Sequence, residues 1–411
     1  MKIIVQKFGG TSVATLEARG AVRKKIIKAL DEGLQPIVVV SAMGRKGEPY
    51  ATDTLLNLIR AENPAVAKHE IDFLISCGEN ISAAIVAANL QAAGIKALAL
   101  TGGQAGIITD DKSGAARILK VDTTYLRELI DDGIVPVVCG FQGSTENGRS
   151  VTTIGRGGSD TTAAAIGAAL KAKAVEIYTD VEGIMTADPR MVKQAEIVEC
   201  ISYGEICQLA YQGAKVIHPR AVEIAMQKNI PLIIKSTFSD APGTLITNDL
   251  GEDTKDTPII DRIASGVTYL PDISQVRIAM NEEQNTAGME IFDLLADSNI
   301  NVDCLNVHPG EIIFTVEEND LDKAVNILHS KGFDKMAVEK SCAKVSVVGA
   351  GMRGVPGVMA TFVRAFVKAG TPILQTVDSN ITISAVIARE HLNKTLAQLH
   401  EAFGLSKSVQ E

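Results

Sequence analysis

The chain has 411 residues, of which 46% are hydrophobic and 22% are charged, and its formal net charge at pH 7 is −9. This length and apolar content predict two or three domains with substantial cores, while the negative charge argues against a broad basic surface for nucleic acid or a membrane. The six cysteines form no CxxC pair and the six histidines lack zinc-ligand spacing, which favours a reduced, cytoplasmic protein whose side chains alone hold no metal.

The first half of the chain alternates short β-branched runs with longer amphipathic or alanine-rich segments. Strands are expected at KIIVQK (2–7), PIVVVS (36–41), KALALT (96–101), IVPVVCG (134–140), VEIYTD (175–180) and PLIIKST (231–237). One helix is expected to run to Gly33 with Thr11 or Ser12 as its N-cap, and another to follow TIGRGGSD with Ser159 or Asp160 as its N-cap. This alternation predicts an α/β fold in which a mostly parallel sheet is sandwiched by helices.

The segment TNDLGEDTKDTPIID at 247–261 is polar, acidic and short of aromatic residues, and we expect it to be a linker. The first domain is therefore expected over residues 1–245 and the linker over 246–262. No uncharged apolar run in the sequence is long enough to span a bilayer, and the N-terminal MKIIVQKFGG does not resemble a signal peptide.

The C-terminal part contains an internal repeat. LDKAVNILH from Leu321 and LNKTLAQLH from Leu392 match at Leu, Lys, Leu and His with an offset of 71 residues. Each copy is expected to form strand, helix, strand, strand, helix and an optional final strand, which predicts two ferredoxin-like βαββαβ modules, over 263–340 and 341–411, with strand exchange between them as an option. His329 and His400 are equivalent positions of this repeat, and we interpret both as exposed or capping helix residues.

Glycine and hydroxyl residues follow five of the expected strands. The segments are Lys7-Phe8-Gly9-Gly10-Thr11-Ser12, Ser41-Ala42-Met43-Gly44, Thr101-Gly102-Gly103, Gly140-Phe141-Gln142-Gly143 and Thr179-Asp180. The carboxyl ends of parallel strands converge at one edge, where backbone N–H groups, a helix N-terminus and a lysine can hold phosphate oxygens. A single such loop would be interpreted as a glycine turn, but five at one edge favour a phosphoryl-transfer site. The P-loop pattern GxxxxGK[ST] and the protein-kinase signature are absent from the sequence, and TIGRGGSD does not have the GxGxxG spacing.

Charged residues complete the candidate site, each with a structural alternative. Arg156 lies among three glycines and has room to bind a carboxylate with its planar guanidinium, although a surface ion pair is the alternative. Glu79 in ISCGENIS could receive an ammonium group or lie on a helix surface. Asp160 and Asp180 could hold Mg²⁺ or hydrogen-bond a substrate, with helix capping as the alternative for Asp160.

Taken together, the motifs resemble those of the aspartokinase family: KFGGTSV, VVSAMG, TIGRGGSDTTAAAIG, YTDVEGIMTADPR and YQGAKVIHPRA, in this order and followed by the tandem modules. The resemblance covers essentially the whole chain. It implies an amino-acid-kinase domain, two ACT modules, and phosphorylation of the side-chain carboxylate of L-aspartate with ATP and Mg²⁺, the first step toward diaminopimelate, lysine, threonine and methionine. Another amino-acid kinase, acting on N-acetylglutamate or glutamate, and a catalytically inactive amino-acid sensor are the alternatives.

The resemblance also implies roles for individual residues. Lys7 and Asp160 would be catalytic. The aspartate site would comprise Thr52, Glu79, Arg156, Gly157, Gly158 and Ser159, with Glu79 at the amino group and Arg156 at the α-carboxylate. The nucleotide site would comprise Lys7, Phe8, Gly9, Gly10, Ser41, Thr179, Asp180, Met185, Arg190 and Lys215. Met185 stands where many members have tyrosine, and the segment GRKGEPYATD before Thr52 is longer than in many relatives.

ACT modules imply feedback control by an amino acid bound between paired modules of a homodimer. The candidate effector residues are Asn285, Gly288, Asn301, Asp303, Pro356 and Gly357. NTAG at 285–288 replaces the D-x-P-G often found in the first module, and the Gln-Asn pair that commonly follows the second strand is missing from NVDCLNVHP. The pattern most resembles the diaminopimelate-sensitive class, so meso-diaminopimelate is expected as the effector before lysine or threonine.

Overall fold

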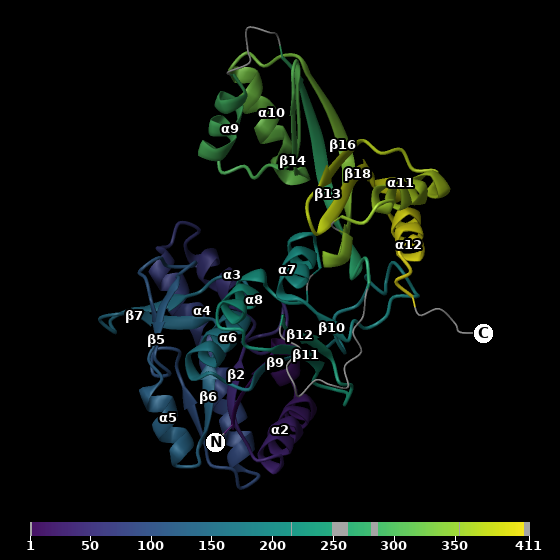
Figure 1. Cartoon of the computed structure of the whole chain (residues 1–411). Helices are drawn as coiled ribbons and strands as arrows, with labels where there is room; N and C mark the ends of the chain where they lie inside the picture. Colours follow the sequence, from purple (N-terminus) through teal and green to yellow (C-terminus); the bar gives the residue numbers. More distant parts are fainter. Residues whose placement is uncertain (1, 215, 249–261, 281–286, 353, 407–411) are drawn as a thin grey trace, which may run out of the picture. The chain divides into compact units, whose positions relative to one another are not determined.

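The computed structural model describes residues 2–214, 216–248, 262–280, 287–352 and 354–406 (Figure 1). The chain divides into two compact units. Unit 1 comprises Met1–Ile184, Ile197–Ala210 and Lys215–Pro258, and unit 2 comprises Met185–Glu196, Tyr211–Ala214 and Ile259–Glu411. The segment Met185–Glu196 therefore groups with unit 2, although it lies inside residues 1–245.

Unit 1 is built around an eight-stranded sheet of order β10-β12-β11-β9-β1-β2-β6-β3. Neighbouring strands run parallel except β11 and β12. The strands are β1 (Lys2–Phe8), β2 (Leu34–Val40), β3 (Ala97–Leu100), β6 (Val135–Cys139), β9 (Ala174–Thr179), β10 (Cys200–Ile201), β11 (Leu232–Ser236) and β12 (Thr244–Ile246). All six strands expected in this half are confirmed, and so is the mostly parallel sheet.

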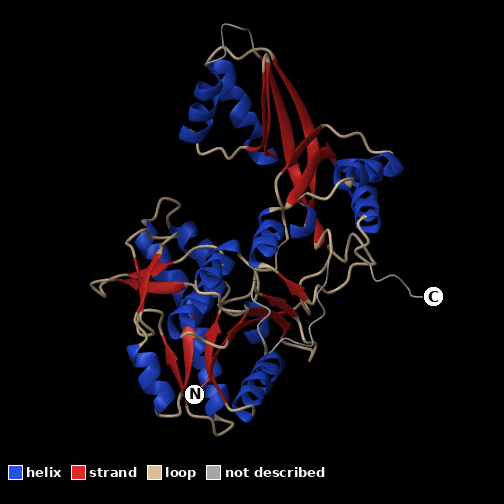
Figure 2. Ribbon diagram, viewed as in Figure 1, coloured by secondary structure: helices blue, strands red, loops and turns tan. Residues whose placement is uncertain are grey.

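Helices flank this sheet (Figure 2). They are α1 (Gly10–Val13), α2 (Leu16–Asp31), α3 (Thr52–Glu62), α4 (Lys68–Gln91), α5 (Thr124–Asp131), α6 (Gly158–Leu170), α7 (Tyr203–Tyr211) and α8 (Pro219–Gln227). Apolar side chains of α2 and α4 form one core with Phe8, Val38 and Val40 of the sheet. A small second sheet of order β5-β4-β7-β8 consists of β4 (Ile107–Thr109), β5 (Ile118–Val121), β7 (Gln142–Thr145) and β8 (Val151–Thr153).

The predicted N-caps of two helices are wrong. Helix α2 begins at Leu16, and the Thr15 hydroxyl accepts the hydrogen bond from the Ala18 N–H at 3.1 Å. Thr11 and Ser12 instead belong to the single-turn helix α1, and the Ser12 hydroxyl bonds to Thr237 at 2.7 Å. Helix α6 begins at Gly158 behind Gly157, whose left-handed backbone (φ 67°) serves as the cap without a side-chain bond. Neither Ser159 nor Asp160 caps it.

Helix α4 is long and apolar enough to cross a membrane by length and composition alone, although its apolar stretch is interrupted by the charged residue Glu79. Half of its apolar window is buried inside the protein, however, and the helix also carries two buried carboxyl groups, Asp72 and Glu79. Asp72 accepts hydrogen bonds from the N–H of Gly114 (3.0 Å) and of Thr153 (3.1 Å). The apolar character of α4 is therefore explained by its place in the core of unit 1.

Unit 2 contains a six-stranded antiparallel sheet of order β14-β15-β13-β16-β18-β17. Its elements are β13 (Gly266–Ala279), α9 (Ala287–Asp297), β14 (Asp303–His308), β15 (Glu311–Glu317), α10 (Leu321–Ser330), β16 (Met336–Val348), α11 (Val358–Ala369), β17 (Gln375–Asp378), β18 (Thr382–Ala388) and α12 (Leu392–Ala402). Short 3₁₀ helices occupy Glu318–Asp320, Ala350–Met352 and Arg389–His391.

The long strands β13 and β16 are shared by two βαββα repeats. Ile273–Ala279 of β13 pairs with β15 of the first repeat. The start of β13, from Gly266 to Leu270, pairs with the end of β16, which in turn pairs with β18 of the second repeat. The second repeat thus takes its last strand from the segment that precedes the first repeat in the sequence.

The equivalent histidines of the two repeats have different environments. His329 is exposed near the end of α10, as expected. His400 is buried, and its Nε2 lies 2.9 Å from the Thr186 hydroxyl, so its interpretation as an exposed or capping residue is wrong. The reason is that Met185–Glu196 packs in unit 2, where Ala187 and Val192 join the core beneath α11 and α12. Burial lowers the pKa of His400.

Candidate active site

The loops after four neighbouring strands of unit 1 begin at the same edge of the sheet. The Ser41 N–H, directly after β2, donates to the Phe8 carbonyl at the end of β1 (3.1 Å). The Gly9 N–H donates to the Tyr178 carbonyl of β9 (3.2 Å), and the Gly140 N–H, after β6, donates to the last residue of β2 (2.9 Å). These bonds continue the parallel ladders by one residue. They bring together the sequence-predicted residues Gly9, Ser41 and Gly140.

Lys7 and Asp160 form an ion pair at this edge. Lys7 extends from β1 toward the first turn of α6, and its Nζ lies 2.6 Å from Asp160 Oδ1, with both side chains less than 15% exposed. A Cβ on Gly9 would lie 3.8 Å from the same Nζ, so the lysine also adjoins the glycine loop. The N-terminus of α6 adds partial positive charge. The arrangement concentrates donors and positive charge where the loops after β1 and β2 begin.

Two of the glycines allow backbone segments to approach closely. A Cβ on Gly10 would lie 2.5 Å from the Ala42 carbonyl oxygen, and the Gly10 carbonyl accepts from the Gly44 N–H at 3.0 Å. A Cβ on Gly140 would lie 2.7 Å from the Ser159 side chain. The loops after β1 and β2 are therefore packed backbone to backbone, and the loop after β6 packs closely against the Ser159 side chain at the start of α6. This spacing explains why the sequence has glycine at these positions.

The loop after β3 has a packing explanation instead. A Cβ on Gly102 would lie 2.0 Å from the Gln142 carbonyl oxygen, and one on Gly143 would lie 2.8 Å from the Ile107 carbonyl oxygen. Both glycines thus serve contacts with the small sheet. For Thr101-Gly102-Gly103, the glycine turn is the better interpretation.

Glu79 is buried in α4, contrary to the alternative that it lies on a helix surface. Its Oε1 accepts a hydrogen bond at 3.0 Å from the N–H of Ala42, the second residue after β2. Its Oε2 is buried and has no hydrogen-bond partner within the described part of the chain. Burial raises the pKa of Glu79 to about 8, against smaller lowering effects of backbone hydrogen bonds. A carboxyl group with an unpartnered oxygen beside the strand ends is equipped to meet a cationic group.

Arg156 and Thr52 lie at the starts of helices in unit 1. Arg156 is exposed in the turn before α6, and among the described residues no hydrogen bond or ion pair holds its guanidinium, so the surface pair is not observed. Thr52 is the first residue of α3, a helix that packs against α4, which carries Glu79. The backbone of Gly157, Gly158 and Ser159 forms the start of α6 beside Asp160.

Thr179 is the last residue of β9 and Asp180 follows it, and Asp180 has a partner that the sequence did not reveal. Asp180 forms an ion pair with Arg45 of the loop after β2, and the Thr179 hydroxyl donates to Asp180 Oδ1 at 3.1 Å. Arg45 stands in the segment GRKGEPYATD, where no motif marks it. The pair joins the loops after β2 and β9.

Two of the candidate nucleotide residues lie outside unit 1. Met185 and Arg190 belong to unit 2, where the Arg190 guanidinium donates to Asp188 (Nη2 to Oδ2, 2.7 Å) and lowers the pKa of that carboxyl. Lys215 lies outside the described residues. Within the described ranges, no group of three His, Cys, Asp or Glu side chains is placed to hold a metal ion.

The candidate effector residues fall in unit 2, with Asn285 outside the described residues. Gly288 lies in the first turn of α9, and Asn301 is exposed before β14. Asp303 forms an ion pair with the buried Lys344 of β16. Pro356 precedes Gly357, the N-cap of α11, which has a left-handed backbone (φ 91°). The sequence did not indicate Lys344.

Comparison with known proteins identifies the relatives of this chain. Residues 2–236 match the amino acid kinase family and residues 345–403 match the ACT domain. Aspartokinase 1 of Bacillus subtilis strain 168 is 46% identical over 411 residues, covering 99% of this chain and 100% of that protein. Structures of E. coli aspartokinase III, one with aspartate and ADP and one with lysine and aspartate, each give a TM-score of 0.75 at 25% identity, covering 98% of this chain and 100% of theirs. The chain therefore belongs to the amino acid kinase family and, within it, to the aspartokinases.

Proposed function

We propose that this aspartokinase transfers the terminal phosphoryl group of ATP to the side-chain carboxylate of L-aspartate at the edge where β1, β2, β6 and β9 end. The Lys7–Asp160 ion pair beside Gly9 and the start of α6 is the observation that carries the proposal. The product is 4-phospho-L-aspartate, which serves the synthesis of diaminopimelate, lysine, threonine and methionine.

The phosphate-binding part of the site consists of Lys7, Gly9 and Gly10, with Ser41 beside them. The acceptor carboxylate is already ionised at neutral pH, so no general base is needed. The barrier instead includes repulsion between this carboxylate and the phosphate oxygens. The Lys7 ammonium, backbone N–H groups and the α6 N-terminus reduce that repulsion and orient the transferred group. Asp160 fixes the direction of the Lys7 side chain through the 2.6 Å contact.

The aspartate-binding part uses Arg156 for the α-carboxylate and Glu79 for the amino group, with Thr52 and the turn Gly157-Gly158-Ser159 as further contacts. Arg156 suits this role because its guanidinium is exposed and without a protein partner among the described residues. Glu79 suits it because its unpartnered Oε2 gains an ammonium donor when aspartate binds. Both charges of the amino acid's backbone are then matched.

The nucleotide-binding part includes Phe8, Thr179 and Asp180 of unit 1. Mg²⁺ is usually held by ATP phosphates, water and one or two carboxylates, a donor set that Asp160 and Asp180 fit. Each of these carboxylates also contacts a cation of the protein, Lys7 or Arg45. When bound with ATP, Mg²⁺ supplies positive charge to the phosphate oxygens.

Unit 2 is proposed to carry feedback regulation by an amino acid. The residues in question are Asn285, Gly288, Asn301, Asp303, Pro356 and Gly357, and meso-diaminopimelate is the first candidate effector, with lysine or threonine second. The sheet shared by the two repeats supports a two-state response, because a ligand on one repeat acts on strands that both contain. We further propose a cytoplasmic homodimer that pairs through these modules.

An acceptor-specificity assay tests the proposed reaction. The purified enzyme is incubated with ATP, Mg²⁺ and hydroxylamine, and with L-aspartate, L-glutamate or N-acetylglutamate in turn, and the hydroxamate is quantified. Hydroxamate from L-aspartate alone is expected. Preference for glutamate or N-acetylglutamate would contradict the proposal. The same assay with added meso-diaminopimelate, lysine or threonine identifies the effector, and inhibition by lysine or threonine without a response to meso-diaminopimelate would overturn the first choice.

A further inference from the structure

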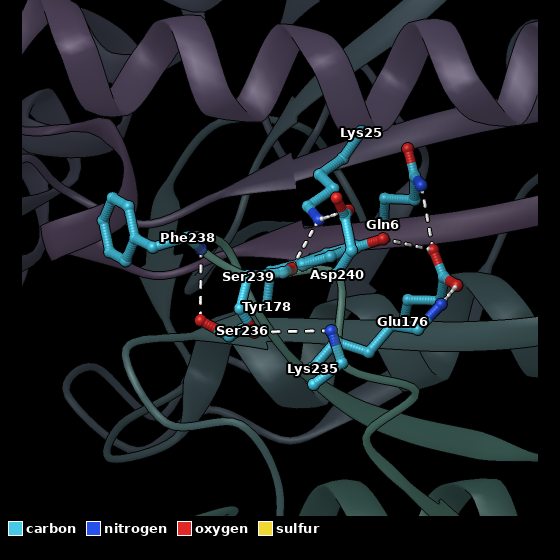
Figure 3. A network of polar contacts seen from close by, with 10 residues as sticks. Gln6, Lys25, Glu176, Tyr178, Lys235, Ser236, Phe238, Ser239 and Asp240 are labelled. Carbon is cyan, nitrogen blue, oxygen red and sulfur yellow. Dashed lines mark hydrogen bonds and ion pairs between the residues drawn. The ribbon is translucent and has the colours of Figure 1, made fainter.

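The carboxylate of Glu176 joins three central strands of the unit 1 sheet (Figure 3). Glu176 is 6% exposed in β9, and its Oε2 accepts hydrogen bonds from Gln6 Nε2 of β1 (2.9 Å) and from the Tyr178 hydroxyl (3.0 Å). Its Oε1 lies 2.6 Å from Lys235 Nζ of β11. One buried carboxylate therefore connects β1, β9 and β11.

Tyr178 links this network to the proposed phosphate loop. Its ring stacks on that of Phe8, with centroids 4.8 Å apart and planes 13° from parallel. Its carbonyl oxygen accepts the Gly9 N–H at 3.2 Å. The side chain and the backbone of Tyr178 thus hold two consecutive residues of the loop, Phe8 and Gly9.

The network and the Lys7–Asp160 pair lie on opposite faces of β1. Successive side chains of a strand point to opposite faces, so Gln6 and Phe8 share one face and Lys7 points to the other. Phe8 packs in the core formed by α2 and α4, whereas Lys7 reaches α6. Glu176 is therefore behind the site and does not touch the reacting groups.

The network borders a polar cavity of about 80 Å³. Gln6 Oε1 is buried at this cavity without a hydrogen-bond partner in the described ranges, so the cavity has both the room and the polar group to hold water. At its outer side, Lys25 of α2 pairs with Asp240 at 2.6 Å. An ion pair taken out of water adds little stability compared with apolar packing, and in some proteins such a pair instead defines a particular geometry.

We propose that Glu176 is a positioning residue that fixes Tyr178 and, through it, the Phe8-Gly9-Gly10 loop on which the phosphoryl group is held. This inference rests on the proposed role of Lys7 and Gly9 in phosphate binding. Loss of the Glu176–Tyr178 bond lets the loop shift, and displacements of about 1 Å at a reacting centre reduce turnover by up to about a hundredfold. Arg156 and Glu79, which are proposed to hold the α-carboxylate and the amino group of aspartate, lie on other segments, so the KM for aspartate is expected to change little.

Three variants of the full chain test the proposal by their effect on kcat and on the KM for aspartate. Tyr178→Phe keeps the ring that stacks on Phe8 but removes the hydroxyl, and Glu176→Gln keeps the shape but removes the charge. Each is expected to lower kcat at least tenfold with an unchanged KM for aspartate and an unchanged far-UV circular dichroism spectrum. Asp240→Asn, at the outer side of the same cavity and 85% exposed, is the matched control and should keep the wild-type kcat.

The double variant separates positioning from a general loss of structure. If Glu176 acts through Tyr178, Glu176→Gln combined with Tyr178→Phe lowers kcat no further than the stronger single change, within about twofold. Glu176→Asp should restore part of the activity. Three results would each overturn the proposal. The first is a wild-type kcat in Tyr178→Phe, and the second is a loss of kcat in the double variant equal to the product of the two single losses. The third is a kcat that falls only in proportion to the folded fraction of the protein. Wild-type turnover in Lys7→Ala would instead contradict the site assignment on which the inference rests.

Discussion

The ammonium group of Lys7 lies 2.6 Å from the carboxylate of Asp160, joining the end of the first strand to the first turn of α6. Neither group is freely solvated, since both side chains are largely buried. Asp160 therefore binds Lys7 and does not cap α6, the alternative that its position in the sequence had left open. It also holds the lysine beside Gly9, where the transferred group is proposed to bind.

Replacing Lys7 by alanine is expected to reduce kcat by about 10²- to 10³-fold, because one preorganised positive charge at the transferred phosphate is lost. The sheet should remain folded, since the main-chain pairing of β1 does not depend on this side chain. Steady-state kinetics with the hydroxamate assay measures the effect. The control is Lys24→Ala, which removes an exposed lysine of α2 and should leave kcat unchanged. Near-normal turnover in Lys7→Ala would remove Lys7 from the mechanism.

The raised pKa of Glu79 predicts a pH-dependent KM for aspartate. Below its pKa of about 8, Glu79 is protonated in the free enzyme, and aspartate must displace that proton to place its ammonium group there. The KM should therefore fall by about tenfold per pH unit as the pH rises toward 8, and level off above it. In Glu79→Gln the KM should be higher and independent of pH. An equally steep pH dependence in this variant would show that another group titrates.

The same group predicts the direction of a stability change. In the unfolded chain Glu79 ionises near its ordinary pKa of 4.5, whereas burial keeps it protonated in the folded free enzyme up to about pH 8. The folded state then binds more protons, so this group makes the free energy of unfolding decline as pH rises between these values. Chemical denaturation at several pH values measures the decline. It should be smaller in Glu79→Gln, and an unchanged decline would contradict the buried, neutral state.

Arg156→Ala should raise the KM for aspartate by about a hundredfold, because a charge-assisted bidentate contact is lost, while the KM for ATP stays the same. Stability should change little, since the side chain is exposed. Arg156→Lys should recover only part of the loss, because an ammonium group cannot reproduce the planar guanidinium. Unchanged kcat/KM for aspartate in Arg156→Ala would refute this role.

Two glycine-to-alanine changes form a matched pair. A methyl group on Gly10 would lie 2.5 Å from the Ala42 carbonyl oxygen, so Gly10→Ala should displace the loop, lower kcat and reduce stability by about 1–3 kcal/mol. Gly20 lies inside α2 with no atom within 4 Å of the added group, so Gly20→Ala should increase stability by about 0.5–1 kcal/mol. Thermal unfolding and kcat are measured for both. Equal behaviour of the two variants would contradict the close packing at Gly10.

Much of unit 1 could be predicted because its strands are apolar β-branched runs whose ends carry glycine. The helix N-caps could not be predicted, because the side chains expected to form them have distant partners. Ser12 forms a hydrogen bond with Thr237, and Asp160 forms an ion pair with Lys7. The sequence also did not reveal the burial of Glu79, which follows from the position of α4 in the core. The strands of the small sheet are only three or four residues long and carry no periodic pattern.

In unit 2, the repeat predicted the elements but not their boundaries. Strands β13 and β16 have 14 and 13 residues, because each serves both repeats, and no local pattern marks where one repeat ends. The different environments of His329 and His400 also arise from contacts between segments that lie far apart in the sequence. Their local sequences match, but only His400 meets a segment from the first half of the chain, at Thr186.

A crystal structure of the enzyme with ADP and L-aspartate tests the central claim most directly. The account predicts the α-carboxylate of aspartate within hydrogen-bond distance, about 3 Å, of the Arg156 guanidinium, its amino group at Glu79, and its side-chain carboxylate facing Lys7 and Gly9. Aspartate bound away from Arg156 and Glu79, or a nucleotide whose phosphates do not approach Lys7, would contradict it.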